Sequence, residues 1–506
     1  MRTARRISQV FFLLFFLFLF FQARYPYETA LSSDLFLRAS PLVAFSTFLA
    51  SRSLASSMFI ALGLLLLTIP LGRFFCGWIC PLGTTIDATD KMFKRKHKKP
   101  ATRFRSWKFF ILAFVLAASV FSVQLIWFFD PIALFTRTMT TVIYPAFSFV
   151  LFGLFNTLFS WGVLENAVYT TFDFAQRTVL PFEQPLFYQS LGVFAVFVVI
   201  IGLGVVSRRF WCRNLCPLGA LLGLFSKWRL TQRYVSQACT HCSQCQKSCR
   251  MNAIEDDYTI NNTVECIECA DCVAVCPPNA VSYRFGKNPG LNEIDFSKRH
   301  FLQAGAAGLA GVAVVKTAQA DVYNKGKAIR PPGAIEENRF LDKCIRCEEC
   351  VKICASTGGC LQPALLETGW EGMWTPVSVP RKGYCEFNCN MCGQVCPTGA
   401  IQELALEKKK TIKLGQAYFD KSRCIPWYSQ EDCLVCEEHC PVSDKAIKFD
   451  ERDTVGPDGS PRTVKFPYLE ENLCIGCGIC ENKCPVVGKP GIFVTASGNQ
   501  RVQFKG

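Results

Sequence analysis

The chain has 506 residues, 29 of them cysteine, and a formal net charge of +15 at pH 7. The length predicts about three domains. The positive charge gathers beside hydrophobic segments, which argues against a nucleic-acid-binding protein and leaves no nucleic acid among the expected partners. A disulfide framework is also disfavoured, because most of the cysteines repeat a metal-ligand spacing.

Residues 1–230 are rich in Phe, Leu and Val and predict a first domain that is an α-helical membrane bundle. About four spans are expected, at 10–21, 56–71, 107–129 and 187–206. The first run follows Arg2, Arg5 and Arg6 and resembles a signal-peptide core, but it lacks a small residue at the −3 position, which favours an uncleaved anchor.

Residues 142–161 are also apolar enough to be a fifth span. Counting them conflicts with the charge pattern, so an interfacial or re-entrant helix is predicted there. Basic residues follow the second and fourth runs, at 91–105 and 208–233, and the positive-inside rule places both stretches and the N-terminus in the cytoplasm. The protein is therefore expected to be a multi-pass protein of the bacterial cytoplasmic membrane.

A Cys-x3-Cys-Pro motif occurs twice in the membrane domain, at Cys76 and Cys80 and again at Cys212 and Cys216, each after an apolar run. This internal repeat predicts a pseudo-twofold unit in which four thiols face one another at the cytoplasmic membrane surface. They would either ligate an additional metal centre or act as catalytic redox thiols. Two structural cysteines in each loop are the alternative.

Arg73, Trp78 and Trp211 flank these motifs and are candidates to contact a quinone head group. Trp and Arg at a membrane interface are more often plain anchors, so both interpretations stay open. Asp130 before Pro131 is a candidate proton acceptor, but a helix N-cap with Pro at the first helical position is the preferred interpretation.

Residues 231–290 hold two four-cysteine blocks with the C-x2-C-x2-C-x3-C spacing of [4Fe-4S] ligands. In two-cluster ferredoxins the fourth Cys ligates the other cluster. One cluster is therefore expected on Cys239, Cys242, Cys245 and Cys276, and the other on Cys266, Cys269, Cys272 and Cys249. Arg250 stands where Pro usually follows the fourth Cys.

Residues 291–335 are predicted to connect this domain to a second ferredoxin. The segment 295–319 is similar to a twin-arginine export signal, although Lys298 replaces the first Arg. Lys298 and Arg299 precede an Ala/Gly-rich run, as an inside-to-outside crossing requires. An Ala/Gly-rich helix or linker between two soluble modules is the alternative.

Residues 336–506 predict a four-cluster ferredoxin domain with small α+β units. The first gap is three residues after Cys385 and eight after Cys424, and Cys360 is either a substitute for Cys354 or a spare thiol. The spacing leaves open which blocks exchange their fourth ligands. The expected ligands, by block, are Cys344, Cys347, Cys350 and Cys354; Cys385, Cys389, Cys392 and Cys396; Cys424, Cys433, Cys436 and Cys440; and Cys474, Cys477, Cys480 and Cys484.

With these motifs, residues 1–285 resemble the membrane ferredoxin-type subunit of the periplasmic nitrate reductase system (NapH). Residues 335–495, with the long gap in the third of four blocks, resemble its four-cluster subunit (NapG). The resemblance implies a quinol dehydrogenase that passes electrons from menaquinol or ubiquinol through six [4Fe-4S] clusters. It implies a cytoplasmic first ferredoxin, a periplasmic C-terminal one, and a periplasmic reductase or cytochrome c as partner.

Two alternatives to the quinol dehydrogenase stay open at this stage. One is a redox assembly or metal-reducing factor, although such relatives lack a second four-cluster module. The other is a non-catalytic electron-transfer subunit of a larger membrane complex, whose quinone site lies on another chain.

Overall fold

The computed structural model describes residues 2–27, 31–53, 58–93, 104–162, 165–286, 298–317, 328–455 and 459–503. Four features predicted above lie partly or wholly outside these ranges. They are residues 56–57 of the second apolar run, residues 94–103 of the basic stretch 91–105, the domain boundary at 290/291, and the two ends of the export-like segment, 295–297 and 318–319.

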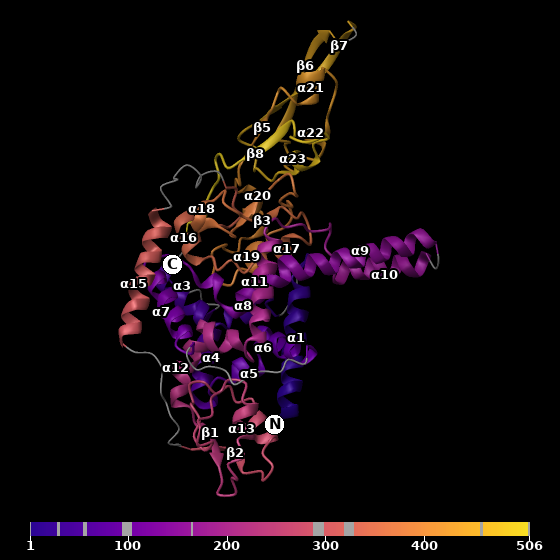
Figure 1. The fold of residues 1–506 in the computed structure, drawn as a ribbon. Helices are drawn as coiled ribbons and strands as arrows, with labels where there is room; N and C mark the ends of the chain where they lie inside the picture. Colours follow the sequence, from indigo (N-terminus) through magenta and orange to yellow (C-terminus); the bar gives the residue numbers. More distant parts are fainter. Residues whose placement is uncertain are drawn as a thin grey trace.

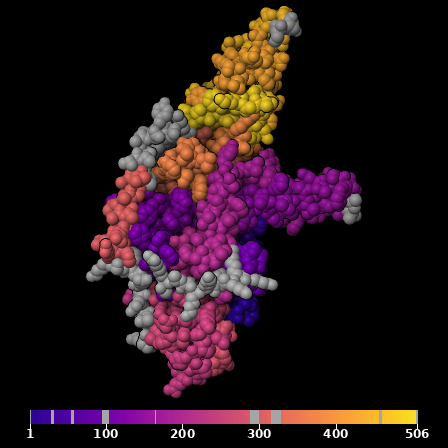
Figure 2. All heavy atoms as spheres, viewed as in Figure 1, coloured from indigo at the N-terminus to yellow at the C-terminus, as the bar shows by residue number. Residues whose placement is uncertain are grey.

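Three parts follow one another along the long axis of the molecule (Figure 1). A helical bundle (residues 2–230) occupies the middle. Ferredoxin 1 (residues 231–286) lies at one end, and the C-terminal module (residues 328–503) lies at the other. In the space-filling view the two cysteine-rich parts form the opposite ends of an elongated molecule (Figure 2).

The bundle is built from helices of very different length. They are α1 (Arg2–Gln22), α2 (Leu35–Arg38), α3 (Pro41–Ser51), α4 (Phe59–Leu71), α5 (Phe74–Trp78), α6 (Pro81–Met92), α7 (Trp107–Val120), α8 (Pro131–Thr138), α9 (Tyr144–Trp161), α10 (Glu165–Thr178), α11 (Ser190–Gly202) and α12 (Pro217–Phe225). Buried apolar side chains from most of them form one core, to which α1 contributes Phe16, Leu19 and Phe20. The first apolar run therefore packs as part of the bundle.

Within the described ranges, two helices are long and apolar enough to cross a membrane, Arg2–Gln22 and the continuous Pro131–Trp161. The other predicted spans form helices of 13 residues (α4), 14 residues (α7) and 13 residues (α11), shorter than the roughly 20 needed for a full crossing. The prediction of one helix over 107–129 is wrong, because the chain turns at Ser122 (φ 59°) after α7 ends at Val120.

The segment 142–161 continues α8 through a π-turn (Met139–Ile143) into α9. Helices α9 and α10 leave the bundle sideways as an arm, in both views (Figures 1 and 2). The interfacial or re-entrant helix stays a prediction, since the continuous helix Pro131–Trp161 also meets the length and composition criteria for a span.

Four of the bundle helices begin with the same local design, a capping residue followed by Pro at the first helical position. The caps are Ser40, Cys80, Asp130 and Cys216. Pro suits this position because its missing N–H would have no partner there. The Asp130 carboxylate accepts hydrogen bonds from Ile132 N (3.0 Å) and Ala133 N (2.9 Å), so the predicted N-cap is confirmed.

The export-like segment forms a single helix, α15 (Lys298–Thr317), that runs beside α7 along the bundle (Figure 1). The contact depends on small residues: a Cβ added at Gly308 would lie 2.9 Å from the Cβ of Ala117. Its 20 residues correspond to about 30 Å of helix. The helix therefore connects the end that carries ferredoxin 1 to the end that carries the C-terminal module.

The cysteine-rich parts have sparse regular structure, in agreement with the predicted α+β units. Ferredoxin 1 contains α13 (Gln244–Ser248) and α14 (Asp271–Ala274) and pairs β1 (Thr231–Val235) with β2 (Val281–Phe285). The four described sheets are all two-stranded and antiparallel.

The C-terminal module is larger, and its longest strands form a hairpin at the far tip of the molecule (Figure 1). Its helices are α16 (Glu337–Lys343), α17 (Glu349–Cys354), α18 (Gly369–Gly372), α19 (Met391–Gln394), α20 (Leu406–Thr411), α21 (Ile425–Ser429), α22 (Val435–Glu438) and α23 (Ile479–Lys483). Its strands are β3 (Leu361–Pro363), β4 (Pro376–Ser378), β5 (Gln416–Phe419), β6 (Ile447–Val455), β7 (Pro461–Leu469) and β8 (Ile492–Thr495).

Candidate iron–sulfur sites

Two small cavities in the C-terminal module are each lined by four block cysteines taken from two different blocks. One, of about 30 Å³, is lined by Cys354, Cys385, Cys389 and Cys392. The other, of about 20 Å³, is lined by Cys440, Cys474, Cys477 and Cys480. In each case the fourth Cys of one block joins the first three of another, which is the arrangement of two-cluster ferredoxins.

The reciprocal sets also lie together. Burial raises the pKa of the Cys350 thiol, and the nearby thiols of Cys347, Cys344 and Cys396 raise it further. Similarly, burial raises the pKa of Cys436 to about 12, with Cys424, Cys433 and Cys484 among its neighbours. The module therefore contains two exchanged pairs: the first block with the second, and the third with the fourth. This pairing could not be deduced from spacing.

Ferredoxin 1 follows the same rule. Burial raises the pKa of Cys272 to about 12, and Cys266 and Cys249 are among its charged neighbours. Cys239 and Cys242 lie beside Cys245, and Cys276 packs against a hydrophobic cluster that contains both Cys245 and Cys272. The structure thus places Cys249 with the second block, as the predicted exchange requires, whereas the place of Cys276 and ligation itself stay predictions.

The donor sets fit cubane clusters. Among the described residues, no group of three or more His, Cys, Asp or Glu side chains is spaced to hold a single metal ion. The four thiolates of a [4Fe-4S] cluster each bind a different iron, so they stand further apart than the ligands of one ion.

Local contacts explain both irregular spacings. In the three-residue gap after Cys385, Lys409 Nζ donates hydrogen bonds to the carbonyl oxygens of Glu386 and Phe387 and holds the longer loop. In the eight-residue gap after Cys424, helix α21 forms and Trp427 Nε1 donates to Pro467 O (3.1 Å) on β7. The long gap therefore supports the base of the terminal hairpin.

Cys360 lies beside a block cysteine, with its Sγ 3.9 Å from the Sγ of Cys354. This hydrogen bond is the largest cause lowering the pKa of Cys354, and it raises the pKa of Cys360 well above the usual range. If Cys354 binds a cluster as a thiolate, the Cys360 S–H is the donor of this hydrogen bond, since a ligand thiolate carries no proton. Sequence reasoning had left it as a spare or substitute thiol.

Replacing Cys360 with alanine is expected to lower the reduction potential of the cluster at Cys354, Cys385, Cys389 and Cys392. A hydrogen bond to a ligand sulfur favours the reduced, more negative cluster, and its loss is worth about 1 kcal/mol, or roughly 40 mV for one electron. Electron paramagnetic resonance during a redox titration measures this potential. Loss of the cluster's signal would instead make Cys360 a ligand.

The paired motifs of the bundle bring four thiols together. Cys80 Sγ accepts from Gly83 N at 3.5 Å, and Cys216 Sγ accepts from Gly219 N at 3.3 Å, so each caps the helix that follows. Cys80 and Cys216 both interact electrostatically with Cys76 and Cys212. We refer to Cys76, Cys80, Cys212 and Cys216 as the four-thiol site.

Two buried arginines are exchanged between the repeats. Arg209, from the second repeat, donates to Cys76 O (2.7 Å) and Gly83 O (3.3 Å) in the first. Arg73, from the first repeat, lies against the second, since a Cβ added at Gly219 would be 2.6 Å from its Nη2. Both side chains are 0% exposed and interact electrostatically with thiols of the four-thiol site. This reciprocity agrees with the predicted pseudo-twofold unit.

Ferredoxin 1 packs directly on this site. Cys76 contacts a hydrophobic cluster that includes Ile267. Trp78 Nε1 donates to Glu268 O (3.1 Å), and Glu265 accepts from Lys108 Nζ (2.6 Å) and lies 3.5 Å from Arg73. The free-energy cost of burying the Glu265 carboxylate away from water is offset by its attraction to Lys108 and Arg73.

The three residues predicted to contact quinone lie in three different environments. Arg73 faces the thiols and Glu265, Trp78 is bonded to ferredoxin 1, and Trp211 is buried with no hydrogen-bond partner for its Nε1 among the described residues. Their role toward quinone stays a prediction. Arg209 was missed, although it holds the same place in the second repeat as Arg73 in the first.

The C-terminal module rests on the other end of the bundle through its first block. Arg346 donates to Gln124 O (3.0 Å), Lys352 Nζ donates to Ala23 O (2.8 Å), and the Trp127 and Trp374 rings lie 5.1 Å apart. Cys347 belongs to the same hydrophobic core cluster as Cys212 and Cys216. Continuous packed protein therefore separates the four-thiol site from the first site of the module.

Six four-cysteine sites in two ferredoxin-like parts define an iron–sulfur electron-transfer protein of the ferredoxin type. Models of a 4Fe-4S binding domain match residues 54–100, 189–233, 392–413 and 467–487, and a 4Fe-4S dicluster domain matches residues 258–355. The first two matches cover the Cys-x3-Cys-Pro motifs. No solved structure matches the chain.

Similarity to named proteins shows which family of ferredoxin-type proteins the chain belongs to. The methylamine utilization ferredoxin-type protein MauM of Methylorubrum extorquens is 33% identical over 194 residues, 38% of this chain and 83% of the relative. The ferredoxin-type protein NapG of Escherichia coli is 36% identical over 197 residues, 37% of this chain and 80% of the relative. The chain belongs to this NapG/MauM-type ferredoxin family. The putative electron transport protein YccM of Escherichia coli is 23% identical over 48% of this chain and 59% of its own length.

Proposed function

We propose that this protein is a membrane-bound quinol dehydrogenase that oxidises menaquinol or ubiquinol and passes the electrons, one at a time, to a redox partner outside the cell membrane. Each quinol gives up two electrons and two protons. The observation that carries the proposal is the position of the two cluster-bearing parts on opposite ends of an apolar bundle, with the four-thiol site beneath ferredoxin 1.

Charge supports an orientation with ferredoxin 1 in the cytoplasm. Arg2, Arg5 and Arg208 lie at the end of the bundle where Asp271 of ferredoxin 1 packs. Positive residues at a helix end favour the cytoplasmic side. The C-terminal module, at the other end of α1, would then lie in the periplasm, and α15 would be the crossing that leads to it.

The arrangement supports a defined order of electron transfer. The site of Cys344, Cys347, Cys350 and Cys396 rests on the bundle, and its exchanged partner follows. Cys385 lies next to Cys477, with Cys385 N donating to Cys477 O at 2.9 Å, which joins the two exchanged pairs. Electrons would leave near the terminal hairpin, to a periplasmic reductase or a cytochrome c.

We further propose that the four-thiol site holds an additional iron–sulfur centre. Its four thiols supply the ligands, and Arg73 and Arg209 balance the negative charge of a thiolate-ligated cluster in a buried position. Such a centre would relay electrons between ferredoxin 1 and the bundle. Within this proposal the catalytic cysteines of the motif act as ligands, and cycling thiols are the alternative.

A second candidate function is an electron conduit across the membrane whose quinone site lies on another chain. Arg73 and Trp78 both donate hydrogen bonds to ferredoxin 1. This favours the conduit, because two of the three residues predicted to contact quinone are used to bind ferredoxin 1. A redox assembly factor has less support, because the four-cluster module extends far beyond the bundle (Figure 2).

Quinol oxidation is tested with the purified chain in detergent under anaerobic conditions. Adding a soluble menaquinol analogue should reduce the clusters at a rate that stopped-flow mixing resolves, seen as bleaching of their visible absorbance. Dithionite provides the fully reduced reference. Clusters that dithionite reduces but the quinol leaves oxidised would exclude a quinone site on this chain and support the conduit.

A further inference from the structure

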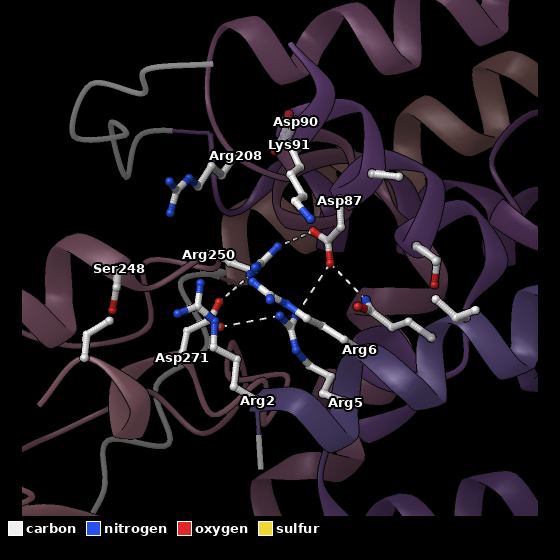
Figure 3. A pocket seen from close by; sticks show the side chains of 15 residues that line it. Arg2, Arg5, Arg6, Asp87, Asp90, Lys91, Arg208, Ser248, Arg250 and Asp271 are labelled. Carbon is white, nitrogen blue, oxygen red and sulfur yellow. Dashed lines mark hydrogen bonds and ion pairs between the residues drawn. The ribbon is translucent and has the colours of Figure 1, made fainter. Parts of the chain in front are cut away.

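A cavity of about 420 Å³ lies where the start of α1, helix α6 and the loops of ferredoxin 1 meet (Figure 3). This volume is in the range of small-molecule sites. Its charged lining is unbalanced, with six cationic side chains against the carboxylates of Asp87, Asp90 and Asp271. The cations are Arg2, Arg5, Arg6, Lys91, Arg208 and Arg250.

Asp87 and Asp271 are already neutralised by arginines. Asp87 lies 2.7 Å from Arg209, which is outside the cavity, and 2.8 Å from Arg250. Asp271 lies 2.5 Å from Arg250 and 3.4 Å from Arg5. These contacts also explain why Arg250 replaces the usual Pro, since it bridges ferredoxin 1 to α6. The excess of positive charge therefore remains for a further anion.

Arg5 gives an independent indication of a missing acceptor. Its side chain is 1% exposed and its Nε has no hydrogen-bond acceptor among the described residues, while its Nη1 lies 3.6 Å from the Asp87 carboxylate, beyond hydrogen-bond distance. Buried guanidinium N–H groups without an acceptor are costly. Arg6, Lys91 and Arg208 are exposed at the cavity and form no ion pair within the described part of the chain.

The cavity continues into an apolar surface. Val10 lines it and is 56% exposed, the exposed side chain of Ile7 shares this face of α1, and those of Phe11 and Leu14 continue it beyond the cavity. An anion site that opens onto an exposed apolar helix face suits an amphiphile. A basic pocket at the cytoplasmic end of a membrane helix is a recognised place for an anionic headgroup.

We propose that this cavity binds the phosphate headgroup of an anionic phospholipid whose acyl chains lie along the exposed face of α1. The lipid would offset the repulsion among the cations and so stabilise the packing of ferredoxin 1 on the bundle. The inference relies on the membrane placement proposed above and is independent of quinol oxidation.

The test uses the full chain, delipidated in a neutral detergent, with binding measured by native mass spectrometry and by the thermal unfolding midpoint. Phosphatidylglycerol should bind and raise the midpoint, while phosphatidylcholine should do neither. The double variant Arg6→Gln/Arg208→Gln should weaken phosphatidylglycerol binding by about 30-fold, since each cation near an anionic lipid contributes about a factor of five. Lys227→Gln/Lys247→Gln removes two exposed cations outside the cavity and should bind as the parent does.

Equal binding of the two lipids, or equal losses in both double variants, would overturn the proposal. Inorganic phosphate that raises the midpoint as much as phosphatidylglycerol would make the cavity a site for soluble anions and overturn the lipid assignment. The quinol assay is run on the same variants. If the Arg6→Gln/Arg208→Gln variant loses lipid binding but still oxidises quinol, the lipid site and the proposed quinol oxidation are shown to be separate properties.

Discussion

Replacing Cys80 and Cys216 together with serine should stop electrons from passing between ferredoxin 1 and the C-terminal module. Both thiols belong to the four-thiol site, and each caps the helix that follows it. Serine oxygens preserve the caps but bind iron–sulfur clusters poorly, so the centre proposed there would be lost. We expect the transfer rate to fall by at least about 100-fold, since even losing an outer-shell partner of a metal site costs up to about that much.

The measurement is stopped-flow reduction of the clusters, with electron paramagnetic resonance to identify which ones are reduced. Iron and sulfide analysis should show the loss of one centre, with the six ferredoxin-type clusters retained. Thr138→Ala is the control, because it removes a buried polar side chain of the bundle outside the four-thiol site and the ferredoxin parts. An unchanged transfer rate with unchanged iron content would mean that the four thiols are structural.

Removing iron with a strong chelator should unfold the C-terminal module and ferredoxin 1 while the bundle stays folded. The short helices and two-stranded sheets of these parts are too small to be stable alone. Structural metal sites supply much of the folding free energy of small metal-binding domains. Helices α1 and α9, with 21 and 18 residues, belong to a bundle that carries its own apolar core.

Hydrogen–deuterium exchange resolves this difference by segment. Peptides from β5, β8 and α23 should lose their protection after chelation, and peptides from α1 should keep it. Reconstitution with iron and sulfide should restore protection and serves as the control. A C-terminal module that kept both its protection and its circular dichroism without iron would contradict the prediction.

The sequence predicted the type of each site, but it did not predict which cysteines from different blocks come together in it. Cysteine spacing reports local loops, so the six blocks were recognisable from the chain alone. The exchange of Cys396 and Cys354 between blocks depends on how two loops pack in space, and spacing carries no information about it. The position of Arg209 opposite the first repeat was hidden for the same reason, although the repeat itself was visible.

Helix lengths were harder to predict than apolar runs. Hydropathy could not separate α7 from the turn at Ser122, because residues on both sides of the turn are apolar. Arg250 appeared only as a departure from the usual Pro, whereas in the structure it links Asp87 of the bundle to Asp271 of ferredoxin 1. Such a link needs partners that are far apart in the sequence.

The side of the membrane on which the C-terminal module lies tests the account most directly. Intact spheroplasts that carry an epitope tag after Gly506 are treated with protease, and a cytoplasmic protein serves as the control for lysis. Digestion of the tag in intact spheroplasts is predicted, because α15 would carry the chain across the membrane. A tag that is protected until the spheroplasts are lysed would place all six cluster sites in the cytoplasm and contradict electron transfer to a periplasmic partner.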